Sequence, residues 1–204
     1  CWFLTATGKF LKEGSMGLNS FTITKERALP IFILADTSGS MIGEKIQAVN
    51  NAIREMIAAL RNVNDVRGVF KVSIITFGGD QVDVQQNPTD VKSIDFHELT
   101  ASGRTPLGQA IEVVTSLIED REIVKSSDYL PTVVLLSDGY PTDFPGSRSA
   151  SYERYLEWDP IKKMHEGKRS SKCLRVAINV DAGSDLNMLR AFLNNGTEPM
   201  MAAD

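Results

Sequence analysis

The chain has 204 residues, a length typical of one domain or of one domain with an extension. Hydrophobic residues make up 42% and charged residues 24%, and the formal net charge is −4. No basic stripe occurs, so neither nucleic acid nor an anionic membrane is an expected partner. The two cysteines, Cys1 and Cys173, lie far apart, which argues against a zinc cluster or a disulfide framework. That cysteine usage favours a reducing, cytoplasmic compartment.

The N-terminal part of the chain stands apart from the rest. Gly14-Ser15-Met16 resembles a cloning scar followed by a start methionine, so residues 1–15 are either a fusion segment or a native extension. We therefore divide the chain into an extension over residues 1–28, a domain over residues 29–197 and a frayed tail over residues 198–204.

Two continuous apolar runs predict central strands. Residues 31–35 form the first run, which ends at Asp36, and residues 132–136 form the second, which is followed closely by Asp138. Such runs are typical of strands buried on both faces of a parallel sheet.

Other segments complete the predicted sheet. Residues 69–77 and 174–180 have the apolar character of further core strands. Val82 and Val84 alternate with polar residues, which predicts a half-exposed, antiparallel edge strand.

Helical spacing of apolar residues separates these strands. The residues that form the two longer stripes are Ile46, Val49, Ile53, Met56, Ile57 and Leu60, and then Leu107, Ala110, Ile111, Val114, Leu117 and Ile118. A short helix is expected over residues 185–193. Alternating strands and helices predict a doubly wound α/β fold, with a mostly parallel sheet and helices on both faces. Ligands of such sheets bind at the carboxyl ends of the strands.

The first polar loop offers oxygen ligands. Asp36, Ser38 and Ser40 supply one carboxylate and two hydroxyls at alternate positions after a strand, and Gly39 lets the loop turn tightly. Oxygen-only ligands suit a hard cation such as Mg²⁺. The alternative is an ordinary turn with a helix cap, in which Ser and Asp are also frequent.

Two further loops place oxygens at the same edge. Thr105 precedes Pro106, which suits the first position of a helix, so Thr105 is either a cap or a ligand. Asp138 follows a buried strand, where an ordinary turn is the alternative. Because strand ends converge, we predict that Asp36, Ser38, Ser40, Thr105 and Asp138 form one metal site.

The phrases LADTSGSM, SGRTPLGQAI and VVLLSDGYPTD carry a resemblance to a known family. They resemble the metal-ion-dependent adhesion site of von Willebrand factor A (VWA) domains, in which Asp-x-Ser-x-Ser is followed by a Thr and an Asp. The chain is most similar to the bacterial tellurium-resistance TerY-like branch. The resemblance covers roughly residues 29–195, and all five positions of the motif are filled.

The resemblance implies a metal-dependent protein-interaction module. Mg²⁺ would have a six-oxygen shell, with Mn²⁺ or Ca²⁺ as alternatives. Ser38, Ser40 and one of the other three side chains would bind directly, and the remaining two would bind through water. A partner protein would offer an acidic residue to the ion, in an intracellular stress or tellurium-resistance system with kinase- or phosphatase-like proteins.

Two other functions remain as alternatives. A Mg²⁺-dependent phosphoryl-transfer or phosphatase enzyme would use Asp36, but Ser38 stands where haloacid-dehalogenase-type phosphatases need a second aspartate. No glycine-rich phosphate loop and no supported Ser–His–Asp arrangement occurs, so the chain is not expected to be an enzyme. A purely structural metal site is the third possibility.

Some residues near the predicted site keep two interpretations. The loop over residues 140–160 carries Phe144, Tyr152, Tyr155 and Trp158, which would either form a binding rim or pack against a short helix. Arg104 would steer an acidic partner or remain solvated.

Overall fold

The computed structural model describes residues 3–4, 10–11, 27–63, 68–147, 150–183, 186–194 and 196–202. In the N-terminal extension, strands β1 (Phe3–Leu4) and β2 (Phe10–Leu11) pair antiparallel. The scar-like Gly14-Ser15-Met16 lies outside the described residues.

A six-stranded sheet forms the centre of the domain, in the order β5-β4-β3-β6-β7-β8. Its strands are β3 (Arg27–Asp36), β4 (Gly68–Gly78), β5 (Gln81–Asp90), β6 (Thr132–Ser137), β7 (Leu174–Asn179) and β8 (Met200–Met201). All neighbours are parallel except β5, which pairs antiparallel with β4. The predicted mostly parallel sheet with one antiparallel edge strand is therefore confirmed.

The C-terminal segment differs from its prediction. Residues 198–204 were expected to fray, yet Met200 and Met201 pair with Ile178 and Asn179 at the edge of the sheet. A strand of two residues with exposed side chains has no clear hydrophobic pattern in the sequence, so it was not predicted. Such an edge strand is held mainly by backbone hydrogen bonds.

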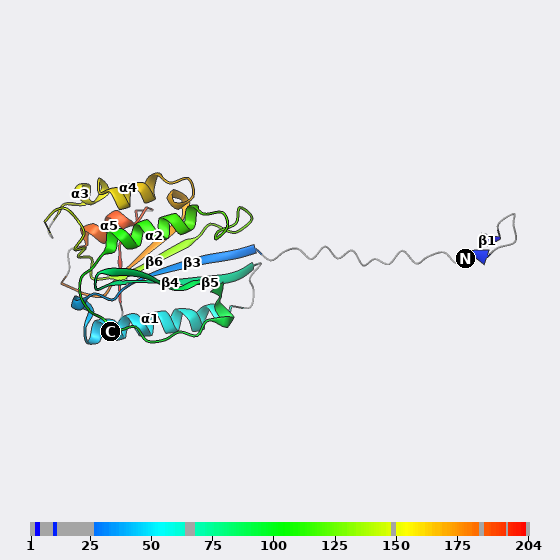
Figure 1. Cartoon of the computed structure of the whole chain (residues 1–204), viewed down its shortest axis with the longest axis horizontal. Coiled ribbons are helices and arrows are strands. Elements are labelled where there is room, and N and C mark those ends of the chain that lie inside the picture. The colour runs from blue at the N-terminus through cyan, green and yellow to red at the C-terminus, as the bar shows by residue number, and fades with distance from the viewer. Residues whose placement is uncertain are drawn as a thin grey trace.

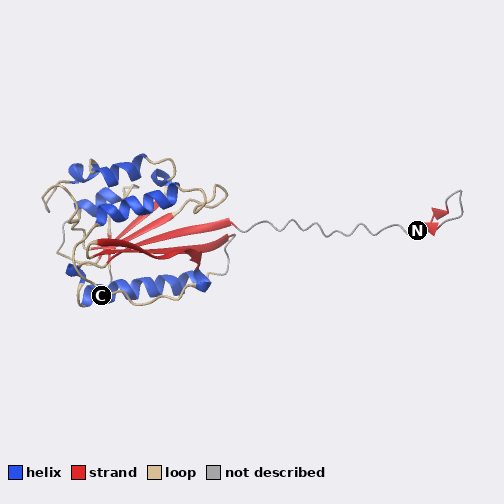
Figure 2. Ribbon diagram, viewed as in Figure 1, coloured by secondary structure: helices blue, strands red, loops and turns tan. Residues whose placement is uncertain are grey.

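Helices cover both faces of the sheet (Figures 1 and 2). Helix α1 (Glu44–Arg61) lies on one face. The helices on the other face are α2 (Leu107–Glu119), α3 (Tyr152–Leu156), α4 (Asp159–Glu166) and α5 (Asn187–Phe192). Short 3₁₀ helices are η1 (Gly39–Met41), η2 (Val91–Ser93) and η3 (Ser170–Lys172). The doubly wound arrangement follows the sequence prediction.

Alternating side chains of β3 explain this layering. Phe32 and Leu34 pack into the core beneath α2, whereas Ile33 and Ala35 pack into the second core, beneath α1. All four are fully buried, as expected for a central parallel strand. The sheet is thus fixed between two apolar layers, and its strand ends provide a rigid base for the loops.

Within the described part of the chain, none of the helices combines the length and apolar character needed to cross a membrane.

Candidate metal centre

Asp36 is the last residue of β3 and is fully buried. Its Oδ1 accepts a hydrogen bond from the backbone N–H of Ser38 at 2.9 Å, and its Oδ2 accepts one from the Ser137 hydroxyl at 2.6 Å. Burial, and to a smaller extent the charge of Asp138, raise the pKa of Asp36 from its ordinary 3.8 to about 6, although these hydrogen bonds lower it. The carboxylate is held in a fixed orientation but is poorly solvated.

Asp138 follows β6, the parallel neighbour of β3. Its side chain is 3% exposed, and among the described residues its buried Oδ1 has no hydrogen-bond partner. A buried carboxylate oxygen without a partner costs roughly 1–3 kcal/mol or more, so such groups in native proteins call for a ligand. This orphaned oxygen, close to a second buried carboxylate, is what a bound cation would satisfy.

The hydroxyls of Ser38 and Ser40 complete the first loop. Their Oγ atoms lie 3.1 Å apart, and Ser38 is buried while Ser40 is exposed. Ser38 is the N-cap residue of η1, but its side chain makes no capping hydrogen bond. The helix-cap alternative therefore does not account for the Ser38 hydroxyl, which remains available as a ligand.

Backbone hydrogen bonds join the Thr105 loop to the Asp36 loop. Ser102 N–H donates to the Thr37 carbonyl at 2.8 Å, and Gly39 N–H donates to the Gly103 carbonyl at 2.9 Å. Thr105 is itself buried and lies two residues before Leu107, the first residue of α2. The structure thus brings the three predicted loops together at the carboxyl end of the sheet. The binding of a metal by their five side chains stays a prediction.

Thr105 is also hydrogen-bonded to Thr142, in the segment after β6, a contact that the sequence did not predict. Thr105 N–H donates to the Thr142 hydroxyl at 3.0 Å, and Thr142 N–H donates back to the Thr105 carbonyl at 2.9 Å. The carboxylate of Asp143 accepts hydrogen bonds from the N–H groups of Gly108 and Gln109, which caps α2. The phrase SDGYPTD contains both residues, but capping by a residue 35 positions away in the chain has no local sequence signature.

Gly103 is required by its conformation and its neighbours. Its φ is +69°, and an added Cβ would lie 2.4 Å from the Gly79 Cα. We expect Gly103→Ala to lower the free energy of unfolding by about 2 kcal/mol or more and to displace Thr105. Urea denaturation measures the first effect. Gly183→Ala is the control, because among the described residues the nearest atom to a Cβ at Gly183 is Asp181 Oδ1, at 3.6 Å. A loss as small in Gly103→Ala as in this control would contradict the prediction.

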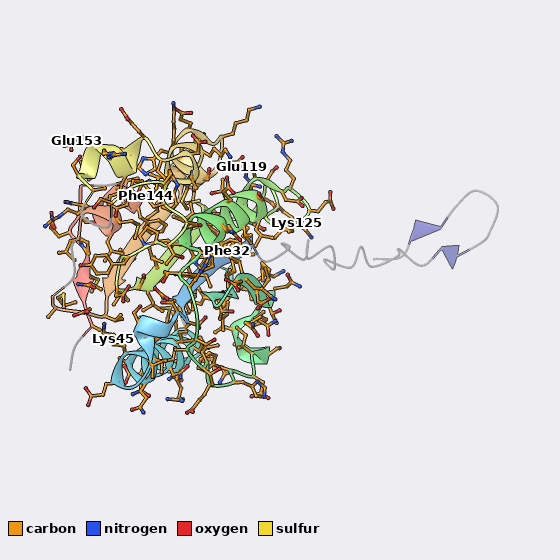
Figure 3. All side chains as sticks on the ribbon, turned by 60° about the vertical axis from the view of Figure 1, so that its left-hand side comes forward. Phe32, Lys45, Glu119, Lys125, Phe144 and Glu153 are labelled. Atoms are coloured by element: carbon orange, nitrogen blue, oxygen red, sulfur yellow. The ribbon has the colours of Figure 1, made fainter. Side chains whose placement is uncertain are left out.

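The aromatic residues after β6 pack in the core and do not form a rim. Phe144 contacts Tyr155 and Trp158, with ring centroids 4.6 and 5.3 Å apart, and both partners are buried. Trp158 also packs against Gly108 of α2, where an added Cβ would meet its ring. Of the four aromatic residues considered, Tyr152 alone is exposed. Figure 3 labels Phe144.

The remaining polar candidates lie outside the site. Arg104 is exposed, and its Nε is 3.9 Å from Asp80 Oδ1, a pair too long and too solvated to fix its position. His97 is exposed, and His165 is partly buried near Arg175, so neither contributes to the cluster. Among the described residues, no group of three or more His, Cys, Asp and Glu side chains is placed to hold a metal. The candidate centre instead combines two carboxylates with three hydroxyls, a set that suits a hard cation.

Comparison with known proteins identifies the class. The sequence model of the von Willebrand factor type A domain matches residues 31–141, more than half of the chain, so the chain belongs to this family. The matched residues include Asp36, Ser38, Ser40, Thr105 and Asp138. A comparison with curated proteins found no match. The TerY-like branch suggested by the sequence stays a prediction.

Solved structures share the fold at low identity. Proximal thread matrix protein 1 from the mussel byssus is 15% identical, with a TM-score of 0.59 over 86% of this chain and 44% of that one. A structure of the same protein with a zinc-occupied MIDAS motif is 19% identical, with a TM-score of 0.58 over 86% and 41%. The chain therefore spans less than half the length of these relatives.

Two other structures are similar in the same way. The manganese-loaded Plasmodium vivax TRAP protein is 20% identical, with a TM-score of 0.55 over 82% of this chain and 62% of that one. The SpRpn10 VWA domain is 15% identical, with a TM-score of 0.55 over 86% of each chain. At these identities the likeness establishes the fold.

Proposed function

We propose that this VWA domain is a metal-dependent protein-interaction module. Its ion is Mg²⁺, held by Asp36, Ser38, Ser40, Thr105 and Asp138, and it binds an acidic residue of a partner protein. The observation that carries the proposal is the buried Oδ1 of Asp138, which has no hydrogen-bond partner in the described part of the chain and lies near the buried carboxylate of Asp36. Two such carboxylates without a cation would repel each other in a poorly solvated place.

The charge of the ligand set explains how a partner would bind. Asp36 and Asp138 together carry two negative charges, which balance a divalent ion, while the three hydroxyl ligands are neutral. Mg²⁺ prefers octahedral coordination and usually retains several waters when proteins bind it. A carboxylate from a partner can replace one of these waters, and the exposed Ser40 marks the side from which it would approach.

The relatives support a divalent ion, although they do not identify which one. One related structure is described as having a zinc-occupied MIDAS motif, and another as manganese-loaded. We assign Mg²⁺ because the ligands are all oxygen atoms, and Mn²⁺ or Ca²⁺ could replace it on the same chemistry.

The burial of Asp36 argues against the enzymatic alternative. A phosphoryl acceptor must be open to its substrate, but the side chain of Asp36 is fully buried. Ser38, rather than a second aspartate, follows two residues later. These features favour binding over phosphoryl transfer.

The proposal also includes a cellular setting for the domain. The phrases LADTSGSM, SGRTPLGQAI and VVLLSDGYPTD support a TerY-like, cytoplasmic protein of a stress or tellurium-resistance system. Kinase- or phosphatase-like proteins of such a system are the proposed partners.

A pull-down with quantification tests the proposed function. The purified chain is used to capture partners from cell extract in Mg²⁺ and in chelator, with the Asp36→Asn variant as a matched control. We expect a partner that is captured at least about tenfold better by the wild type in Mg²⁺, and whose binding is lost when its acidic contact residue is replaced by the amide. Equal capture in Mg²⁺ and in chelator would instead indicate a structural metal site.

The raised pKa of Asp36 predicts how metal binding depends on pH. Because the pKa is about 6 in the metal-free chain, a proton competes with the cation below pH 6, whereas an ordinary aspartate would compete only near pH 4. We expect Mg²⁺ affinity to fall by roughly tenfold between pH 7.5 and pH 5. Isothermal titration calorimetry at several pH values measures the change. A constant affinity over this range would show that Asp36 is ionised throughout.

A further inference from the structure

Lys45 lies beside the candidate metal centre in the first turn of α1. Its Nζ donates a hydrogen bond to Asp181 Oδ2 at 2.7 Å and lies 3.9 Å from Asp138 Oδ2. Figure 3 shows Lys45 at the start of α1. The ammonium group therefore joins three segments that are far apart in sequence: the start of α1 and the loops after β6 and β7.

Asp181 is held in place as an anchor for this lysine. Its Oδ1 accepts a hydrogen bond from Gly183 N–H at 3.1 Å, and its own N–H donates to Asn179 Oδ1 at 3.1 Å. The Asn179 side chain also donates to the Asp181 carbonyl at 2.7 Å. The hydrogen bond from Lys45, and after it the one from Gly183, lower the pKa of Asp181. Asp181 is thus a negatively charged group with a fixed direction.

The two oxygens of Asp138 stand in different environments. Oδ1 is buried without a partner among the described residues, whereas Oδ2 lies close to the ammonium group of Lys45. A divalent ion bound at Asp138 would therefore lie near a fixed positive charge, and that charge would repel it. The Lys45 side chain is 29% exposed, so solvent screens this repulsion only in part.

We propose that Lys45 and Asp181 set the cation affinity of the site in opposite directions. Lys45 is a tethered positive charge that competes with the metal for Asp138 and weakens its binding. Asp181 strengthens metal binding, because it draws the ammonium group toward the β7 loop and adds a negative charge nearby. The inference rests on the proposed metal site and names two residues that regulate it without being ligands.

The direction of the change in Mg²⁺ affinity distinguishes this proposal from a merely structural salt bridge. Loss of either partner breaks the same Lys45–Asp181 bond, so a structural bridge predicts the same direction of change for both variants. Electrostatic control of the metal site predicts opposite changes in Mg²⁺ affinity for the two variants. Lys45→Met removes a repelling charge and leaves Asp181 attractive, whereas Asp181→Asn frees Lys45 to move onto Asp138.

Calorimetric titration with MgCl₂ tests the proposal on the full chain. We expect Lys45→Met to bind Mg²⁺ roughly three- to tenfold more tightly than the wild type, and Asp181→Asn to bind it more weakly by a similar factor. Both changes should shrink as the salt concentration rises, because the charges are partly exposed. Lys45→Arg, which keeps the charge, should remain near the wild type.

Lys163→Met provides a matched control. Lys163 makes an equally short salt bridge, 2.7 Å, with Glu112 between α4 and α2. This variant should leave Mg²⁺ affinity within about twofold of the wild type, because an exposed pair away from the site contributes little. Thermal unfolding followed by circular dichroism confirms that each variant is folded, and Lys45→Gln replaces Lys45→Met should the latter fail to fold.

The outcomes distinguish failure of the inference from failure of the proposed function. Equal affinities, or changes of the same sign in the Lys45 and Asp181 variants, overturn the inference while the metal site stands. A wild-type chain that binds no more Mg²⁺ than Asp36→Asn overturns both. Opposite signs with an unaffected Lys163 variant support the assigned roles.

Discussion

Replacing Asp36 with Asn should reduce Mg²⁺ affinity by at least about a hundredfold and, in chelator, make the domain more stable. The amide fits the observed geometry, because its oxygen can accept from Ser38 N–H and its NH₂ group can donate to the Ser137 hydroxyl. It cannot supply the negative charge that a divalent ion requires at this position. Calorimetry with MgCl₂ measures the first effect.

The gain in stability follows from the pKa of Asp36, which rises from 3.8 to about 6 on folding. Between these values the folded chain binds more protons than the unfolded chain, so the stability of the metal-free domain falls as pH rises from about 4 to about 6. Above pH 6 the full cost applies, on the order of 3 kcal/mol. Urea denaturation in chelator should show Asp36→Asn more stable at pH 7 by about 1–3 kcal/mol, with little difference at pH 4. A variant that is less stable than the wild type at pH 7 would contradict this explanation.

Arg175→Met should have the largest effect on folding while leaving Mg²⁺ affinity unchanged. Arg175 lies on β7 and is 1% exposed. Its guanidinium donates to the carbonyls of Met164, Ser170 and Phe192, at 3.0, 3.0 and 3.2 Å. Burial lowers its pKa to about 10, which leaves it charged at neutral pH. It therefore joins segments in and near α4, η3 and α5. The Ser170 carbonyl also accepts a hydrogen bond from Cys173 N–H, at 3.2 Å.

Methionine keeps much of the volume of the side chain but removes the three hydrogen bonds that the guanidinium donates. A buried hydrogen bond from a charged group contributes roughly 1.5–3 kcal/mol, so we expect a loss of about 3–5 kcal/mol in the free energy of unfolding. Urea denaturation measures the loss. Arg190→Met is the control, because Arg190 makes an exposed pair with Glu198 and should cost less than about 1 kcal/mol. Similar losses in the two variants would show that the buried hydrogen bonds of Arg175 contribute little.

Apolar periodicity was sufficient to predict the main elements of the fold. The continuous run over residues 31–35 places side chains in both cores, and the stripes of α1 and α2 are buried as their spacing predicts. The short strand β8 was missed, because Met200 and Met201 are exposed and gain order from backbone pairing with β7. Arg175 was counted within an apolar strand. Its guanidinium is buried against three carbonyls from separate parts of the chain, and no local sequence pattern predicts these contacts.

In the candidate site, too, local sequence patterns predicted some residues, whereas contacts between distant segments could not be predicted. The meeting of the loops that carry Asp36, Ser38, Ser40, Thr105 and Asp138 was predictable, because each of these residues follows a strand or precedes a helix and parallel strand ends converge. The supporting residues were not predicted. Ser137 orients Asp36, Thr142 clamps Thr105, and Lys45 meets Asp138 and Asp181, all through contacts between distant segments. The sequence of the long loop also left two roles open for its aromatic residues, and mutual packing places Phe144, Tyr155 and Trp158 in the core, whereas Tyr152 is exposed.

We propose that one divalent cation is bound where the three loops meet. The most direct test is a crystal structure of the chain grown with Mn²⁺, in which anomalous scattering locates the ion. We predict a single strong anomalous peak surrounded by Asp36, Ser38, Ser40, Thr105 and Asp138, with the oxygens of the directly bound side chains about 2–2.6 Å from it. An anomalous map without a peak among these five side chains, or with its strongest peak elsewhere on the domain, would contradict the account.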